Sequence, residues 1–185
     1  HGLVYAFEPT GYAYAKLLKN IFLNPQLGKR IIPIQTFISD KSGSEHSLIA
    51  YSSWKVDGIS QDAHPLHGGT KKDAKSIPAI SIDEFCAIKK INRVDFIKID
   101  TDGYEFQVLT GARKMIESCH PAIVFEIGLD INEQNTPFEK FWEYFSSLNY
   151  TLFDSRKKKK ITLDNFHRHI PLRFATDIIA VPPLA

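Results

Sequence analysis

Residues 94–105 read Val94-Asp95-Phe96-Ile97-Lys98-Ile99-Asp100-Thr101-Asp102-Gly103-Tyr104-Glu105. The first six are mostly apolar and predict a strand over Val94–Ile99, while Asp100–Gly103 is typical of a turn. A helix is expected next, over Tyr104–Glu117, and then a second strand over Pro121–Ile127. A strand, a helix and a strand in this order predict two parallel strands joined by a right-handed crossover.

The same alternation of short apolar runs and helical patterns extends in both directions. Upstream, we expect strands over Leu3–Phe7, Arg30–Ile38 and Leu48–Tyr51, and helices over Tyr12–Leu23 and Ser81–Ile91. Downstream, we expect a helix over Thr136–Leu148, capped by Thr136, and strands over Tyr150–Asp154 and Ala175–Val181.

This pattern predicts an α/β, Rossmann-like fold with a mostly parallel sheet and helices on both of its faces. The last two strands are not separated by a helix, so an antiparallel edge strand is expected. With 185 residues, 43% of them hydrophobic, the chain suits one globular domain spanning residues 1–185.

Composition argues against several kinds of partner. The net charge is +2 and the pI about 8.5, which is too mild to indicate nucleic acid or an anionic membrane, and neither is expected. No apolar run approaches the roughly 20 residues that cross a bilayer, and no secretory signal is visible. Two cysteines, Cys86 and Cys119, fit a reducing, cytoplasmic location. No zinc pattern is present.

Acidic residues follow several of the expected strands. In open parallel sheets, ligands bind beyond the carboxyl ends of the strands. Any one such carboxylate is also explained as a cap or a solvated turn, but together they predict a site at one sheet edge. These residues are Glu8, Asp40, Asp100, Asp102 and Glu126. Glu8 precedes Pro9, as in a plain turn, but its two acceptor oxygens also suit the two hydroxyls of a ribose.

Lys98 is unusual in an apolar strand, where an unpaired buried lysine is costly. Period-two alternation places Asp100 on the same face, within reach. The pair is either a structural ion pair or part of a reaction site, and the residues leave both open. Asp100, Asp102 and Glu105 also suggest Mg²⁺ or Ca²⁺, but their spacing is not that of an EF-hand and we expect no metal. His64 and His67 are either solvated or a general base.

These segments resemble landmarks of the FkbM methyltransferase family. The resemblance covers nearly the whole chain, and the Lys98-Ile99-Asp100 segment is its most specific part. Where this family usually has glutamate, this chain has Asp102. The matching segments are Val4–Pro9, Ser39–Gly43, Ser81–Phe85, Val94–Glu105, Val108–Ala112 and Pro121–Glu126.

The resemblance implies a class I methyltransferase that moves a methyl group from S-adenosylmethionine to a hydroxyl of a sugar or polyketide-type acceptor. It implies cofactor contacts from Glu8, Pro9, Ser39, Asp40 and Asp100, with Glu8 on the ribose and Asp40 near the adenine. The implied catalytic residues are Asp100, Asp102, Lys98 and Glu105. Proton removal from the acceptor would fall to Asp100, then Asp102, then a loop histidine.

The family's first strand and glycine-rich loop would precede Leu3, and this sequence has neither. The domain is therefore expected to be N-terminally incomplete, and this chain by itself to bind S-adenosylmethionine weakly. One alternative is a degenerate, non-catalytic binding module that serves assembly or carbohydrate recognition. A less favoured alternative is a nucleotide-dependent oxidoreductase, which also places a strand-end acid on ribose. The sequence leaves the oligomeric state open.

Overall fold

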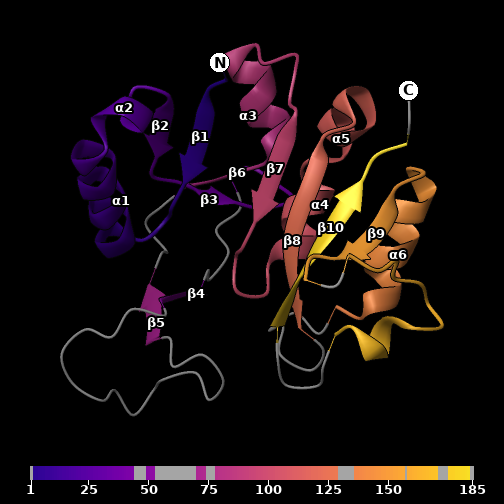
Figure 1. Cartoon of the computed structure of the whole chain (residues 1–185). Coiled ribbons are helices and arrows are strands. Elements are labelled where there is room, and N and C mark those ends of the chain that lie inside the picture. The colour runs from indigo at the N-terminus through magenta and orange to yellow at the C-terminus, as the bar shows by residue number, and fades with distance from the viewer. Residues whose placement is uncertain are drawn as a thin grey trace. The chain divides into compact units, whose positions relative to one another are not determined.

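The computed structural model describes residues 2–43, 49–52, 70–73, 78–128, 136–156, 158–170 and 175–183. It divides into two compact units, unit 1 (His1–Ile80) and unit 2 (Ser81–Ala185), whose elements are labelled in Figure 1. Within the described ranges, no helix is long and apolar enough to cross a membrane. The expectation of one domain over 1–185 stays a prediction.

Unit 1 begins with a strand–helix–strand unit (Figure 1). Strands β1 (Val4–Phe7) and β2 (Ile31–Ile34) pair in parallel, with Val4 opposite Ile31 and Phe7 opposite Ile34. Helices α1 (Gly11–Leu23) and α2 (Pro25–Gly28) connect them. The predicted end of the first helix before Pro25 is confirmed, because the proline ring fits the first turn of a new helix but not the interior of the old one.

Gly28 lets α2 fold back against α1. A Cβ atom added at this position would lie 2.7 Å from the backbone oxygen of Ile21, closer than side chains approach backbone atoms. The backbone amide of Gly28 donates to the carbonyl of Asn24 at 2.8 Å. Only glycine therefore permits this tight connection between α1 and β2.

The strand expected over Arg30–Ile38 is two strands, so that prediction was wrong in its extent. After β2 the chain changes partner, and β3 (Phe37–Ile38) pairs in parallel with β6 (Ala79–Ile80). The Thr36 hydroxyl anchors the change by donating to the carbonyl of Pro78 at 2.6 Å. Local hydropathy misses the break because Phe37 and Ile38 are as buried as a continuous strand would require.

Two further strands of unit 1 pair with each other. The short strand expected over Leu48–Tyr51 is present as β4 (Ile49–Ser52). It is antiparallel to β5 (Thr70–Asp73), which the sequence analysis did not predict. The polar composition of β5 explains this omission, because no alternation of apolar residues marks it as a strand.

The main sheet of unit 2 has the strand order β7-β8-β10-β9. Strands β7 and β8 are parallel, while β10 is antiparallel to both of its neighbours. The α/β fold class is confirmed, but the antiparallel strand lies inside the sheet rather than at its edge. Alternate residues of β10, such as Ile178 and Ala180, are fully buried, which suits an interior strand. The strands are β7 (Phe96–Ile99), β8 (Ala122–Gly128), β9 (Thr151–Asp154) and β10 (Ala175–Val181).

One face of this sheet forms the core of unit 2. On β8, alternate residues of this face are almost completely buried, among them Ile123 and Phe125. The ring of Phe125 stacks on Phe141 at 5.4 Å and on Phe145 at 5.2 Å, both from helix α6 (Phe138–Ser147). The period-two register places Lys98 of β7 and Glu126 of β8 on the opposite face.

The helix expected over Tyr104–Glu117 is broken into α4 (Glu105–Thr110) and α5 (Arg113–Cys119). The two carboxylate oxygens of Asp83, on α3 (Ile82–Lys89), accept the backbone amides of Lys114 at 3.0 Å and Met115 at 2.8 Å. This long-range cap satisfies the first amides of α5, so that they need no carbonyl of the preceding turn.

Two helix starts differ in how well local sequence predicted them. Ser81 caps α3 as expected, since its hydroxyl accepts the amide of Glu84 at 3.2 Å. Helix α6 begins at Phe138, with Pro137 at its N-cap, so Thr136 is not the cap that was predicted. A proline adopts the extended backbone of an N-cap readily and has no amide to satisfy.

Candidate active site

The turn after β7 is organised by Glu105. Its Oε1 accepts the backbone amide of Thr101 at 2.9 Å and the Thr101 hydroxyl at 3.0 Å. The amide of Gly103 lies 3.2 Å from Oε1 and 3.1 Å from Oε2. Asp102 and Gly103 have φ angles of 51° and 108°, which aspartate tolerates and glycine favours. The predicted turn is therefore confirmed, and the side chain of Glu105 holds it through these hydrogen bonds.

Glu105 is only 4% exposed. Burial raises the pKa of its carboxyl group, while the hydrogen bonds from the turn act in the opposite direction. These bonds engage both of its oxygens, which indicates a structural part in holding the turn. A direct part for Glu105 in catalysis stays a prediction.

The Lys98 ammonium and the Asp100 carboxylate form the expected ion pair, with Nζ 2.5 Å from Oδ2. The premise that Lys98 is buried was wrong, because the side chains of Lys98 and Asp100 are 53% and 55% exposed. In water such a pair contributes only about 0–1 kcal/mol to folding. Its position immediately before the turn leaves the structural and functional interpretations both open.

Glu126 is the fifth of the seven residues of β8, so the expectation that it follows the strand was wrong, and the sequence could not show its environment. On one side, Ile99 of β7 is opposite Phe125, and Asp100 follows Ile99 as Glu126 follows Phe125. On the other side, Asp177 of β10 is opposite Glu126. Both neighbouring strands therefore bring an acid to the level of Glu126 in the sheet. Burial raises the pKa of Glu126 to about 7, and the negative charges of Asp100, Glu105, Asp102 and Asp177 add to the effect.

Asp177 was missed by the sequence analysis. It is the third residue of β10, and it lies opposite Glu126 because β10 is antiparallel to β8. The position of Asp177 beside Glu126 could have been predicted if the antiparallel pairing of β10 with β8 had been known. Local sequence does not show which strands pair.

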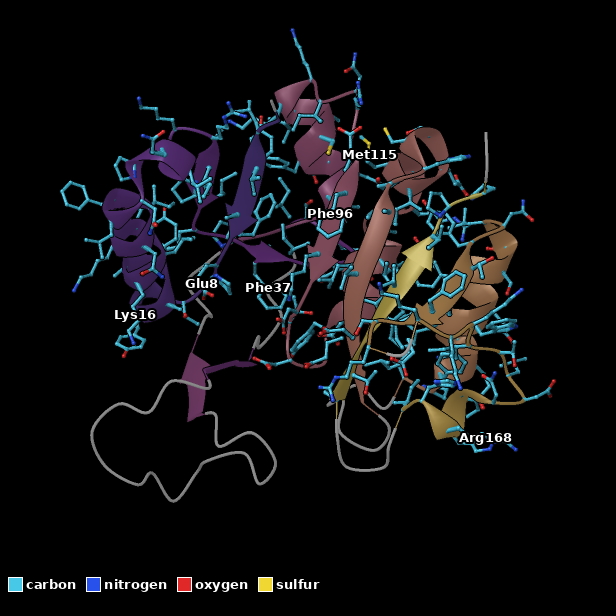
Figure 2. All side chains as sticks on the ribbon, in the orientation of Figure 1. Glu8, Lys16, Phe37, Phe96, Met115 and Arg168 are labelled. Carbon is cyan, nitrogen blue, oxygen red and sulfur yellow. The ribbon has the colours of Figure 1, made fainter. Side chains whose placement is uncertain are left out.

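Unit 1 carries the residues expected to contact the cofactor. Glu8 lies directly after β1 (Figure 2), and its backbone amide donates to the carbonyl of Ile34 at 3.2 Å. Its Oε1 accepts both the amide and the hydroxyl of Thr10, at 2.8 Å and 2.6 Å. The same carboxylate thus caps the turn that leads into α1, and its Oε2 is not used by these two bonds.

Ser39 and Asp40 follow β3 in the same unit. Ser39 is 3% exposed, and its amide donates to the carbonyl of Ile80 at 3.1 Å. Its hydroxyl donates to Oδ1 of Asp40 at 3.1 Å, which orients that carboxylate. The half-buried Asp40 keeps a second acceptor oxygen that this bond does not use.

The predicted residues thus fall into two sets, with Glu8, Pro9, Ser39 and Asp40 in unit 1 and Lys98 to Glu105 in unit 2. His64 and His67 lie outside the described residues. Across the ranges that the structure describes, no three His, Cys, Asp or Glu side chains form a group that could hold a metal ion.

The turn at Lys98–Glu105 and the acids Glu8, Asp40 and Glu126 lie within residues 1–152, and this range matches the model of a known domain. The model of the methyltransferase FkbM domain matches residues 1–152. The chain belongs to this family, as its sequence indicated.

Two relatives agree with this assignment. The chain is 27% identical over 124 residues to the hexuronic acid methyltransferase AglP of Haloferax volcanii, covering 65% of this chain and 46% of that protein. The crystal structure of methyltransferase FkbM from Methylobacillus flagellatus KT superposes with a TM-score of 0.55 and 17% identity. That alignment covers 96% of this chain and 36% of the crystallised one, and it confirms the Rossmann-like methyltransferase fold. The chain therefore spans less than half the length of each relative.

Proposed function

We propose that this chain supplies strand-end residues of an S-adenosylmethionine-dependent O-methyltransferase that acts on a hydroxyl of a sugar or polyketide-type acceptor. The observation that carries the proposal is the row of carboxylates around Glu126. Burial and these neighbouring negative charges raise the pKa of Glu126 to about 7. A group with such a pKa is suited to take up a proton at physiological pH.

The residues of unit 1 suit the nucleoside part of the cofactor. Glu8 is held by Thr10 through one oxygen, so the other is available to a ribose hydroxyl. Asp40, oriented by Ser39, offers an acceptor to an amine such as that of adenine. Bound S-adenosylmethionine would supply a methyl group on a positively charged sulfur, ready for attack by an oxygen.

In unit 2 the carboxylates would act on the acceptor. Asp100, Asp102 and Glu126 are the candidates to accept a hydrogen bond from its hydroxyl and then its proton. If the acceptor oxygen bonded to the methyl carbon, the carbon–sulfur bond would break and the sulfur would keep that electron pair, which leaves the hydroxyl proton for these carboxylates to accept. Such a transfer depends mainly on alignment, so the rigid turn held by Glu105 would position Asp100 and Asp102.

A sugar acceptor is supported by the relative that is named for a hexuronic acid. Methyl transfer should therefore be assayed with the complete product of the coding sequence, S-adenosylmethionine labelled in its methyl group, and sugars with and without a carboxylate. Label in a sugar ether is the expected product. Persistent inactivity across these acceptors, with cofactor binding intact, would favour the non-catalytic module instead.

Substitution separates the two sets of residues. D100N and E126Q should each lower kcat by about 100-fold or more, as expected when a proton acceptor is lost, while the exposed D164N serves as the control. E8Q should instead weaken binding of the cofactor by about tenfold, because a charged acceptor is replaced by a neutral one. Unchanged kcat in D100N would remove Asp100 from the mechanism.

The expectation of weak cofactor binding by this chain alone is tested by calorimetric titration. A dissociation constant in the low micromolar range for this chain and S-adenosylmethionine would contradict that expectation. It would be supported if the product of the whole coding sequence bound the cofactor and this chain did not.

A further inference from the structure

The outer side of α1 is apolar although no residue of this helix or of α2 is buried. Leu17 and Ile21, four positions apart on one side of α1, are half-buried. Leu18 and Phe22, one position further round the helix, are 43% and 81% exposed. Helix α1 is thus apolar on two sides, and a sheet-packing helix needs only one.

The exposed apolar residues form one stripe. Ala15, Leu18 and Phe22 are separated by three and four positions, so they lie above one another along the helix. Leu23, at the end of α1, and Leu27, on the adjoining helix α2, are 61% and 65% exposed. Large apolar side chains gathered in this way indicate a surface that is covered by a partner.

The charge of the same segment has a single sign. Residues 9–39 contain no aspartate or glutamate, although the whole chain has 21 of them. The basic residues of this stretch are Lys16, Lys19, Lys29 and Arg30. Lys16, labelled on α1 in Figure 2, has its ammonium 4.5 Å from the centre of the Tyr12 ring. The net charge of the whole chain is only +2, but residues 9–39 taken by themselves are basic.

These two properties select one kind of occupant. A second copy of the chain placed on this surface would bring lysines of like charge together, which opposes a two-fold contact. An anionic bilayer surface attracts those lysines and also takes up exposed leucine and phenylalanine side chains. Basic residues beside an apolar stripe are the composition of helices that lie in the membrane interface.

We propose that α1 and α2, through Leu18, Phe22 and Leu27 with the neighbouring Lys19 and Lys29, bind peripherally to a lipid bilayer that carries negative charge. Together these residues form the α1–α2 surface. The proposal goes beyond the proposed methyltransferase function, and it departs from the expectation, based on net charge, that no membrane is a partner.

The test is sedimentation of the protein with vesicles of phosphatidylcholine containing roughly 30% phosphatidylserine. Binding is expected at about 0.1 M salt and should weaken at about 0.5 M, because screening shortens the reach of the charges. F22S should lower the partition coefficient by about tenfold, since one phenylalanine ring no longer enters the interface. The double variant K19Q/K29Q should lower it by about 25-fold, at roughly fivefold for each lysine.

The control is I88S, on α3, because Ile88 is 62% exposed but lies outside the α1–α2 surface. It should bind vesicles as the unaltered protein does, and circular dichroism should show that F22S keeps its fold. Absence of binding to the anionic vesicles overturns the proposal, as does equal loss in I88S and F22S. A dimer in light scattering that F22S abolishes, without vesicle binding, would show that a second copy is the occupant.

Discussion

Replacing Glu126 by glutamine should make the protein more stable at alkaline pH. Burial and four neighbouring carboxylates raise the pKa of Glu126 to about 7 from an ordinary value of 4.5. Between these values the folded chain binds a proton that the unfolded chain has released. The free energy of unfolding therefore falls as the pH rises through this window and levels off above it. Glutamine carries no charge and removes this dependence.

The size of the effect follows from the two pKa values. The difference from 4.5 to about 7 corresponds to about 3.4 kcal/mol if the site were dry. Because Glu126 is only half-buried, water screens part of this cost. We therefore expect E126Q to gain about 1.5 kcal/mol over the unaltered protein at about pH 8, and almost nothing at about pH 5.

Urea unfolding followed by far-UV circular dichroism at several pH values measures this difference. E143Q is the matched control, since Glu143 is an exposed residue of α6. A gain in E126Q that does not change with pH would refute the reasoning, as would a loss of stability at about pH 8. In the methyl-transfer assay the same variant should lose activity, so a stable but inactive E126Q would separate the proposed chemical part of Glu126 from folding.

Substitutions at three further residues test other contacts of unit 2 by urea unfolding. E105A should cost about 3 kcal/mol, because it leaves the half-buried turn amides without an acceptor, whereas E105Q keeps one oxygen and should cost about 1 kcal/mol; equal costs would contradict this. Y144F should cost about 1 kcal/mol, since the Tyr144 hydroxyl donates to the buried carbonyl of Leu109 at 2.6 Å, and no change would show that the bond is not needed. H169A should cost about 3 kcal/mol, because Nδ1 of His169 lies 3.0 Å from the carboxylate of Asp154, which is 2% exposed; a neutral result would mean that water replaces the ring.

Much of the fold was predictable because apolar residues recur with one period in strands and with another in helices. The strand that ends at Ile99 and the turn that follows it were predicted from a six-residue run with four apolar residues and from a glycine. Glu105 binds atoms only two to four residues away, so the shape of the turn is a local property. The residues that carry the family resemblance lie in these local segments, which is why the family could be recognised before any contact was known.

Contacts between distant residues were not predictable in the same way. Asp83 caps a helix 31 residues away and so divides what local periodicity presents as one helix. Burial contributes most to the raised pKa of Glu126, and the smaller contribution of Asp177 exists only because β10 lies between β8 and β9. Hydropathy marks a residue as apolar or polar but does not show what will cover it. For the same reason, the exposure of Phe22 could not be predicted from the sequence.

The sequence by itself thus determined most of the elements and the family, because these depend on neighbours along the chain. The tertiary structure decided what each acid does. It showed Lys98 paired but exposed, Glu105 committed to the turn, and Glu126 surrounded by like charges. Burial and sheet register set those outcomes, since both depend on which strands become neighbours in space.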